Sequence, residues 1–178
     1  PRDSELLVNL SCKRINLQPH LTDMPFYQFH EKQEVNATMD EIWNLISSPA
    51  NLKEITPDHM GFEITSGELP EKMYPGMMVS YKVTPLLGLK MNWLTEITHV
   101  KEGEYFVDEQ RFGPYAMWHH KHKIEPIDGG VLMTDIVTSQ PPFGFLGAIA
   151  NKLFIKKKLA EIFAYRRKAV ELRFGKFG

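Results

Sequence analysis

The sequence predicts an α+β fold in which a bent antiparallel β-sheet of about seven strands packs around one long C-terminal helix, with two short helices after the first strand. From residue 60 to 139, strand-like segments are separated by short turn-forming stretches, and short connections favour antiparallel neighbours. After residues 141–142 (Pro-Pro) the spacing of apolar residues changes to that of an amphipathic helix. The two early helices are too short to cross over a parallel sheet.

Composition indicates one soluble globular domain. The chain has 178 residues, of which 43% are hydrophobic and 24% charged, and a chain of this length buries roughly 70% of its extended surface. We expect the domain at residues 26–175 and an N-terminal extension of unknown role at residues 1–25. No segment is apolar for long enough to insert stably in a membrane, and the first residues are not a secretory signal. The single cysteine, Cys12, cannot form an intramolecular disulfide, so a reducing, cytoplasmic location is expected.

The first elements have clear boundaries. We expect a strand over Phe26–Val35 and short helices over Asp40–Ser47 and Ala50–Ile55. Thr38 and Glu41 have the spacing of a capping box, in which each side chain bonds the backbone N–H of the other residue. Each short helix must end before a proline, Pro49 or Pro57, because the residue before a proline disfavours helical geometry.

Six further strands and one helix complete the prediction. The strands are expected over Phe62–Ile64, Val79–Val83, Trp93–Ile97, Tyr105–Arg111, Met117–Glu125 and Val131–Ser139. A helix is expected over Gly147–Arg173, with an apolar face made of Ile149, Leu153, Ala160, Phe163, Val170 and Phe174. That face would cover one side of the sheet.

Several motifs, in this element order, resemble the SRPBCC or START-like superfamily. They are 51-NLKEITP-57, 106-FVDEQ-110, 113-GPY-115, Trp118-x-His120-x-His122, Thr134-Asp135, Pro142-x-Gly144-x-x-Gly147 and 162-IFxYR-166. The nearest likeness is to small bacterial ligand-binding members of the polyketide cyclase/dehydrase type, and it spans residues 26–173. The resemblance implies a helix-grip fold, a cavity between sheet and C-terminal helix, and no metal or other cofactor. Because this fold hosts carriers, receptors and enzymes alike, the resemblance does not fix the chemistry.

Alternation in the strand over residues 117–125 places Trp118, His120 and His122 on one face. Lys121 and Lys123 alternate with them and favour solvent, so the histidines should face the concave side of the sheet and His119 should point outward.

Turn positions suggest what lies opposite this strand. If the Asp-Gly-Gly turn at residues 128–130 pairs residue 125 with residue 130, Asp135 lies opposite His120. If residue 112 pairs with residue 116, Asp108 lies opposite His120 and Gln110 opposite Trp118. A slip of one residue in either pairing would reverse the faces.

These residues define a candidate polar wall with two interpretations. Either the histidines and aspartates form a structural network, or they contact a ligand; His120, His122 and Asp135 are the candidates for acid–base catalysis. The two histidines with Asp135 could also supply three metal ligands, but we expect no metal. The apolar part of the cavity would be formed by Tyr81, Trp93, Phe106, Met133 and Phe163, each of which could equally be a core residue.

The C-terminal helix is basic. Residues 141–178 carry nine basic and two acidic side chains, although the net charge of the chain is −1. The basic residues of the helix are Lys152, Lys156, Lys157, Lys158, Arg166, Arg167, Lys168 and Arg173. Such a helix can bind an anionic membrane or nucleic acid, but its apolar face is needed by the sheet, so we interpret the charges as a solvated outer face.

The sequence thus predicts a protein that binds a small, partly apolar molecule (lipid-, polyketide- or aromatic-like) between sheet and helix, without bound nucleic acid. A cyclase- or dehydratase-type enzyme with a His/Asp acid–base pair is the first alternative, although binding without catalysis is preferred. A peripheral membrane or nucleic-acid interaction module that uses the basic helix is the second.

Overall fold

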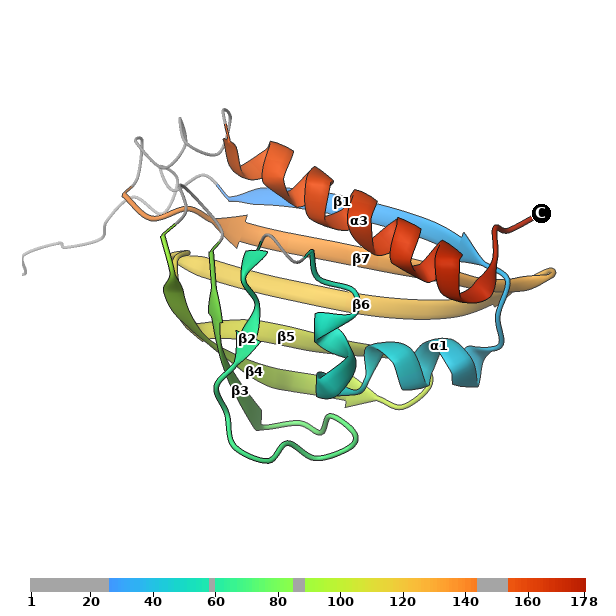
Figure 1. The fold of residues 1–178 in the computed structure, drawn as a ribbon, viewed down its shortest axis with the longest axis horizontal. Helices are drawn as coiled ribbons and strands as arrows, with labels where there is room; N and C mark the ends of the chain where they lie inside the picture. The colour runs from blue at the N-terminus through green and yellow to red at the C-terminus, as the bar shows by residue number, and fades with distance from the viewer. Residues whose placement is uncertain (1–25, 58–59, 85–88, 144–153) are drawn as a thin grey trace, which may run out of the picture.

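The computed structural model describes residues 26–57, 60–84, 89–143 and 154–178. Seven strands form one antiparallel sheet in the order β1-β7-β6-β5-β4-β3-β2, and a long helix lies at the C-terminal end of the chain (Figure 1). The predicted fold class is confirmed. The expectations for residues 1–25, for the turn at 86–88 and for the start of the last helix at 147–153 lie outside the described residues.

The elements run in the order predicted, and several are longer than expected. They are β1 (Tyr27–Val35), α1 (Met39–Ile46), the 3-10 helix η2 (Pro49–Lys53), β2 (Glu63–Ile64), β3 (Met77–Val83), β4 (Met91–Lys101), β5 (Tyr105–Phe112), β6 (Met117–Ile127), β7 (Gly130–Gln140) and α3 (Lys156–Phe174). The second short helix is thus a 3-10 helix. Its first residue is Pro49, whose fixed φ suits a helix start.

The predicted capping box at the start of α1 is present. The Thr38 Oγ1 atom accepts a hydrogen bond from the backbone N–H of Glu41 at 3.3 Å, and Glu41 Oε2 accepts one from the backbone N–H of Thr38 at 2.8 Å. The hydrogen bond from the Thr38 backbone lowers the pKa of Glu41. The cap fixes where α1 begins, and its buried face, which includes Ile42 and Leu45, then packs into the core.

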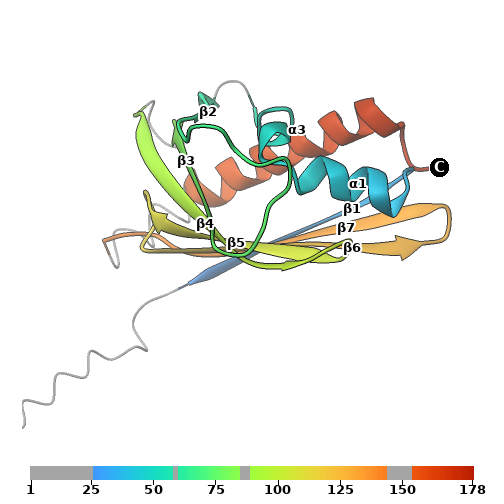
Figure 2. The ribbon, with the colours of Figure 1, turned by 90° about the horizontal axis from the view of Figure 1, so that it is seen from below.

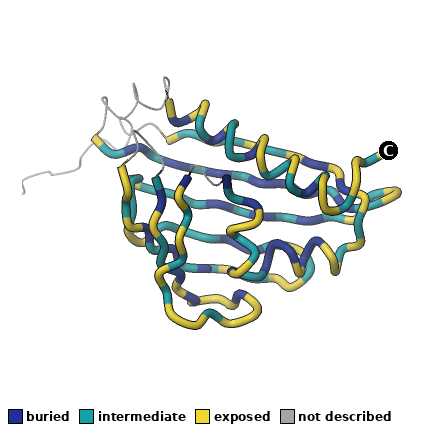
Figure 3. Tube along the Cα trace, viewed as in Figure 1, coloured by how far each residue is buried: buried dark blue, intermediate teal, exposed yellow. Residues whose placement is uncertain are grey.

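Both helices lie on one face of the sheet, and β3 and β4 curve toward them (Figure 2). Along strands β4, β6 and β7, buried positions alternate with less buried ones (Figure 3), so one face of the sheet is the buried one. The side chains of α3 that reach the core are Leu159, Phe163 and Val170. Ala160, which the sequence analysis placed on the apolar face, is exposed. Phe163 and Val170 belong to the predicted face, and Leu159 takes the place of its neighbour Ala160 in it.

The pairing of β6 with β7 corrects one predicted register. The structure pairs Ile127 with Gly130, which leaves a two-residue loop in which Gly129 has a φ of +79°, a conformation that glycine adopts without strain. The prediction paired residue 125 with residue 130. The shift is two residues, an even number, so every side chain stays on its predicted face. However, Asp135 lies opposite His122 and not opposite His120.

The pairing of β5 with β6 places Asp108 opposite His120, as predicted. His120 and His122 are both buried and His119 is only partly so, which agrees with the predicted faces. Among the described residues, no helix is long and apolar enough to cross a membrane.

Candidate functional site

A pocket of about 160 Å³ lies between the inner face of the sheet and α3. Strands β3 to β6 supply one wall, α3 supplies the other, and residues from the 52–62 segment reach it as well. Most lining side chains are aromatic or aliphatic. Eight of the eleven side chains that the sequence analysis proposed line this pocket: Tyr81, Trp93, Phe106, Asp108, Trp118, His120, His122 and Phe163.

The other three proposed residues do not line it. Gln110 holds the end of β5, because its amide donates to the Tyr115 carbonyl at 2.7 Å and accepts from the Tyr115 N–H at 3.2 Å. Met133 is packed in the main core cluster. Asp135 is buried and contacts both histidines. Its influence on the pocket therefore passes through them.

Aromatic rings form the apolar part of the pocket. Trp93 stacks on Tyr81 with ring centroids 5.9 Å apart, and it meets Trp118 edge-on at 5.3 Å. His122 stacks on Phe106 at 4.1 Å. These contacts pack the aromatic rings of this wall against one another.

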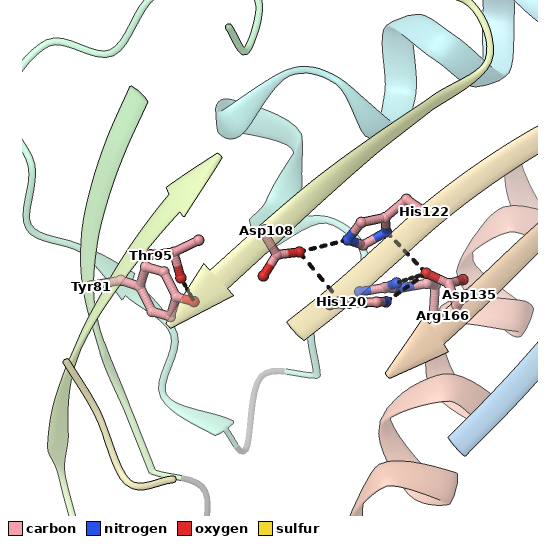
Figure 4. Close-up of polar contacts among 7 residues, drawn as sticks. All are labelled: Tyr81, Thr95, Asp108, His120, His122, Asp135 and Arg166. Atoms are coloured by element: carbon pink, nitrogen blue, oxygen red, sulfur yellow. Dashed lines mark hydrogen bonds and ion pairs between the residues drawn. The ribbon is translucent and has the colours of Figure 1, made fainter. Parts of the chain in front are cut away.

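Two histidines and two aspartates form a buried network on the polar side (Figure 4). His122 contacts both carboxylates: its Nε2 atom is 2.8 Å from Asp108 Oδ2, and its Nδ1 atom is 2.9 Å from Asp135 Oδ1. His120 Nε2 lies 2.8 Å from the same Asp135 oxygen, and its Nδ1 atom is 3.6 Å from Asp108 Oδ2.

The geometry makes His122 the charged histidine. A neutral imidazole has one donor and one acceptor, so only the imidazolium donates to both carboxylates. Burial acts to lower the pKa of His122, but the hydrogen bonds to Asp108 and Asp135 outweigh it and raise that pKa.

His120 is the neutral histidine. Burial and the nearby charge of His122 lower the pKa of His120, and its contacts with Asp135 and Asp108 only partly offset this. Its Nε2–H donates to Asp135, and its Nδ1 lone pair receives no hydrogen bond from a described residue, because the group near Nδ1 is the Asp108 carboxylate at 3.6 Å, which only accepts.

Arg166 completes the network from α3. Its Nη1 atom is 3.2 Å from Asp135 Oδ1, and its side chain is 12% exposed. Burial raises the pKa of Asp135, but the Arg166 charge and the bonds from both histidines hold it well below its usual value. The positive charges of Arg166 and His122 therefore balance the two carboxylates. The sequence analysis placed Arg166 on the solvated face, and this was wrong: it follows Phe163 by three residues and so shares the buried face.

A second polar group lies across the pocket from the network. The hydroxyl of Tyr81 and Oγ1 of Thr95 are 2.8 Å apart (Figure 4). Burial and the charge of Asp108 raise the pKa of Tyr81, so its hydroxyl stays protonated. Thr95 was not predicted, although its spacing from Trp93 in β4 places it on the same face.

The cluster was also considered as a metal centre. Ligand atoms of Asp108, His120 and His122 lie within 4.8 Å of one another, which suits zinc in residue type. A metal bound there would have to displace the proton from His122, whose two nitrogens both donate to carboxylates, and Arg166 already places a positive charge beside Asp135. The donor set therefore fits an internal ion network better than a metal. The absence of a metal stays a prediction.

Comparison with known proteins identifies the fold and nothing finer. No family model matches the chain, and no curated protein is similar to it in sequence. Among solved structures, protein CV1439 from Chromobacterium violaceum has a TM-score of 0.63 at 10% identity and covers 84% of this chain and 98% of its own. Ara h 8.0201 has a TM-score of 0.58 at 17% identity, with 84% and 97% covered. Major latex-like protein 151 from Panax ginseng has a TM-score of 0.60 at 10% identity, with the same coverage. These neighbours have the helix-grip fold of Bet v 1-like proteins, and this chain shares it.

Proposed function

We propose that the protein is an SRPBCC or START-like ligand-binding protein that holds a small, partly apolar molecule in the pocket between sheet and α3. The observation that carries this proposal is an aromatic pocket with one polar side. On that side, the positive charges of His122 and Arg166 balance the two carboxylates of the buried network. Ligand pockets are typically apolar with a few convergent polar groups. A lipid-, polyketide- or aromatic-like compound fits this description.

Native mass spectrometry of the protein purified from its own host tests the proposal. We expect a co-purified small molecule, whose level falls when the pocket is filled. Ile162→Trp adds bulk to a residue of α3 that lines the pocket, and Ala164→Trp introduces the same side chain at an exposed residue of the same helix. Loss of the bound molecule in the first variant alone supports the pocket. Equal retention by both variants would place the ligand elsewhere.

The state of His120 favours a second candidate, an acid–base enzyme of the cyclase or dehydratase type. Burial lowers the pKa of His120, Asp135 orients its ring, and the residue lines the pocket. This arrangement suits a general base. Turnover of a carbonyl-bearing substrate that is lost in His120→Gln, while the melting temperature and ligand binding persist, would favour the enzyme. Unchanged turnover in that variant would exclude His120 as the base.

A further inference from the structure

We propose that Asp108 Oδ1 and the Tyr81–Thr95 hydroxyl pair form a subsite for a neutral hydroxyl group of the ligand, either an alcohol or a phenol. This inference rests on the proposed function, because it assigns the polar contact that a ligand makes in the same pocket. All three residues line that pocket.

The first observation is a carboxylate oxygen without a partner. Asp108 Oδ2 receives the His122 hydrogen bond and is the oxygen nearest to His120, but no described residue donates to Oδ1. Figure 4 shows Oδ1 directed away from the histidines, toward the side on which Tyr81 and Thr95 lie. The Asp108 side chain is largely buried. Oδ1 therefore keeps acceptor capacity that a donor from a ligand or from water can use in the pocket.

The second observation concerns the hydroxyl hydrogens. Tyr81 and Thr95 have one hydroxyl hydrogen each, and their mutual bond uses only one of the two. The other hydrogen is available to an acceptor. The sheet wall of the pocket therefore offers an acceptor at Asp108 and a donor at the hydroxyl pair.

The strand register sets the distance between them. Asp108 lies opposite Ile97, and Thr95 is two residues from Ile97 on the same face of β4, so Asp108 and Thr95 are diagonal neighbours. Diagonal neighbours have Cβ atoms about 7–8 Å apart, before their side-chain oxygens reach inward. A hydroxyl that accepts one hydrogen bond and donates another bridges roughly 5 Å between two oxygens. A single hydroxyl therefore fits the space.

Charge balance and hydrogen-bond roles argue against a carboxylate, a carbonyl and an ammonium group at this subsite. A carboxylate would be repelled by Asp108, and a carbonyl has no hydrogen to donate to Oδ1. An ammonium group would add a third positive charge beside His122 and Arg166, where two carboxylates already balance those charges. A hydroxyl both donates and accepts, and it leaves the charges balanced.

Calorimetric titration with 2-naphthol, naphthalene and 2-methoxynaphthalene tests the subsite at pH 7. Naphthalene lacks the hydroxyl, and the methoxy compound can only accept. We expect 2-naphthol to bind about tenfold or more tightly than either, and Tyr81→Phe, Thr95→Val and Asp108→Asn to reduce this preference to threefold or less. Tyr105→Phe, which removes a hydroxyl from a residue outside the pocket lining, should leave it unchanged. Thermal melts check that each variant folds, and Tyr81→Phe keeps the ring that packs on Trp93.

The outcomes separate the two proposals. Equal binding of the three compounds, or an equal loss of preference in Tyr105→Phe, overturns the hydroxyl subsite while the apolar pocket stands. If none of the compounds binds wild-type protein, the proposed function fails and the subsite fails with it. A preference for 2-naphthol that Tyr81→Phe and Thr95→Val both leave unchanged also overturns the subsite.

Discussion

Replacing Arg166 by methionine tests whether the buried network depends on balanced charge. The Arg166 side chain is 12% exposed and that of Asp135 8%, so the substitution removes one of the two positive charges that contact a buried carboxylate. Removing one partner of a buried ion pair destabilises a protein by about 3–5 kcal/mol. For a chain of this length, each kcal/mol corresponds to about 2–4 °C in melting temperature, so we expect a decrease of about 6–20 °C.

The adjacent arginine supplies the control. Arg167 pairs with Glu31 on the surface, and those side chains are 40% and 25% exposed. An exposed pair of this kind contributes about 0–1 kcal/mol, so Arg167→Met should lower the melting temperature by only a few degrees. Both substitutions remove the same charge from the same helix and differ in burial.

The assay is urea unfolding at pH 7.5 and pH 5.5, followed by tryptophan fluorescence. In wild-type protein the pKa of His120 is lowered by burial, so His120 weakens stability as the pH falls below about 6.5. Without Arg166 the unbalanced carboxylate raises the His120 pKa, and a proton on His120 restores the balance at pH 5.5. The loss of stability in Arg166→Met should therefore shrink at pH 5.5, by about 1 kcal/mol. A loss no larger than that of Arg167→Met, or one that grows at pH 5.5, would refute the charge-balance argument.

Four further predictions concern the histidines, the helix cap and the basic helix. Imidazole ¹⁵N spectra at pH 7 should show both nitrogens of His122 protonated and His120 neutral, because only the imidazolium donates to two carboxylates; a neutral pattern for His122 would contradict this. The folded-state pKa of His122 is raised, so charged His122 stabilises the fold fully below about pH 6.5. This stabilisation is lost as the pH rises through the folded-state pKa, and urea titrations at a series of pH values would detect the loss. Thr38→Ala should destabilise the fold by about 1 kcal/mol, with Thr38→Ser close to wild type, and identical urea midpoints for all three proteins would argue against the cap. The protein should not co-sediment with anionic vesicles at physiological ionic strength, and salt-dependent pelleting that is lost when lysines 156–158 are neutralised would support the membrane alternative instead.

Alternation in the strands was enough to predict the faces. His120 and His122 point inward because polar Lys121 and Lys123 alternate with them, and that pattern is local. Strand boundaries were predicted less well. Strand β6 ends at Ile127 and β7 begins at Gly130, because the glycine at position 129 allows a two-residue loop. The composition of the turn did not distinguish this short loop from a longer one.

The helix shows a different limit. Lys152 to Arg173 is rich in basic residues, and composition alone indicated that all of them are solvated. Arg166 departs from this because it shares a face with Phe163 and because Asp135, far away in the sequence, lies beneath it. Helical spacing could have identified Arg166 as inward-facing. Its partner could be known only from the tertiary fold, since burying an arginine is favourable only where a carboxylate meets it.

The two-residue shift between β6 and β7 preserves every face but changes which residues lie opposite each other. In the observed register Asp108 lies opposite His120, and Asp135 lies opposite His122. Each histidine nevertheless hydrogen-bonds the aspartate opposite the other one: His120 Nε2 bonds Asp135 and His122 Nε2 bonds Asp108, both at 2.8 Å. Residue type and alternation therefore place these four side chains on one wall. Which histidine bonds which carboxylate depends on how the side chains cross between strands, and this is not contained in the pattern of any one strand.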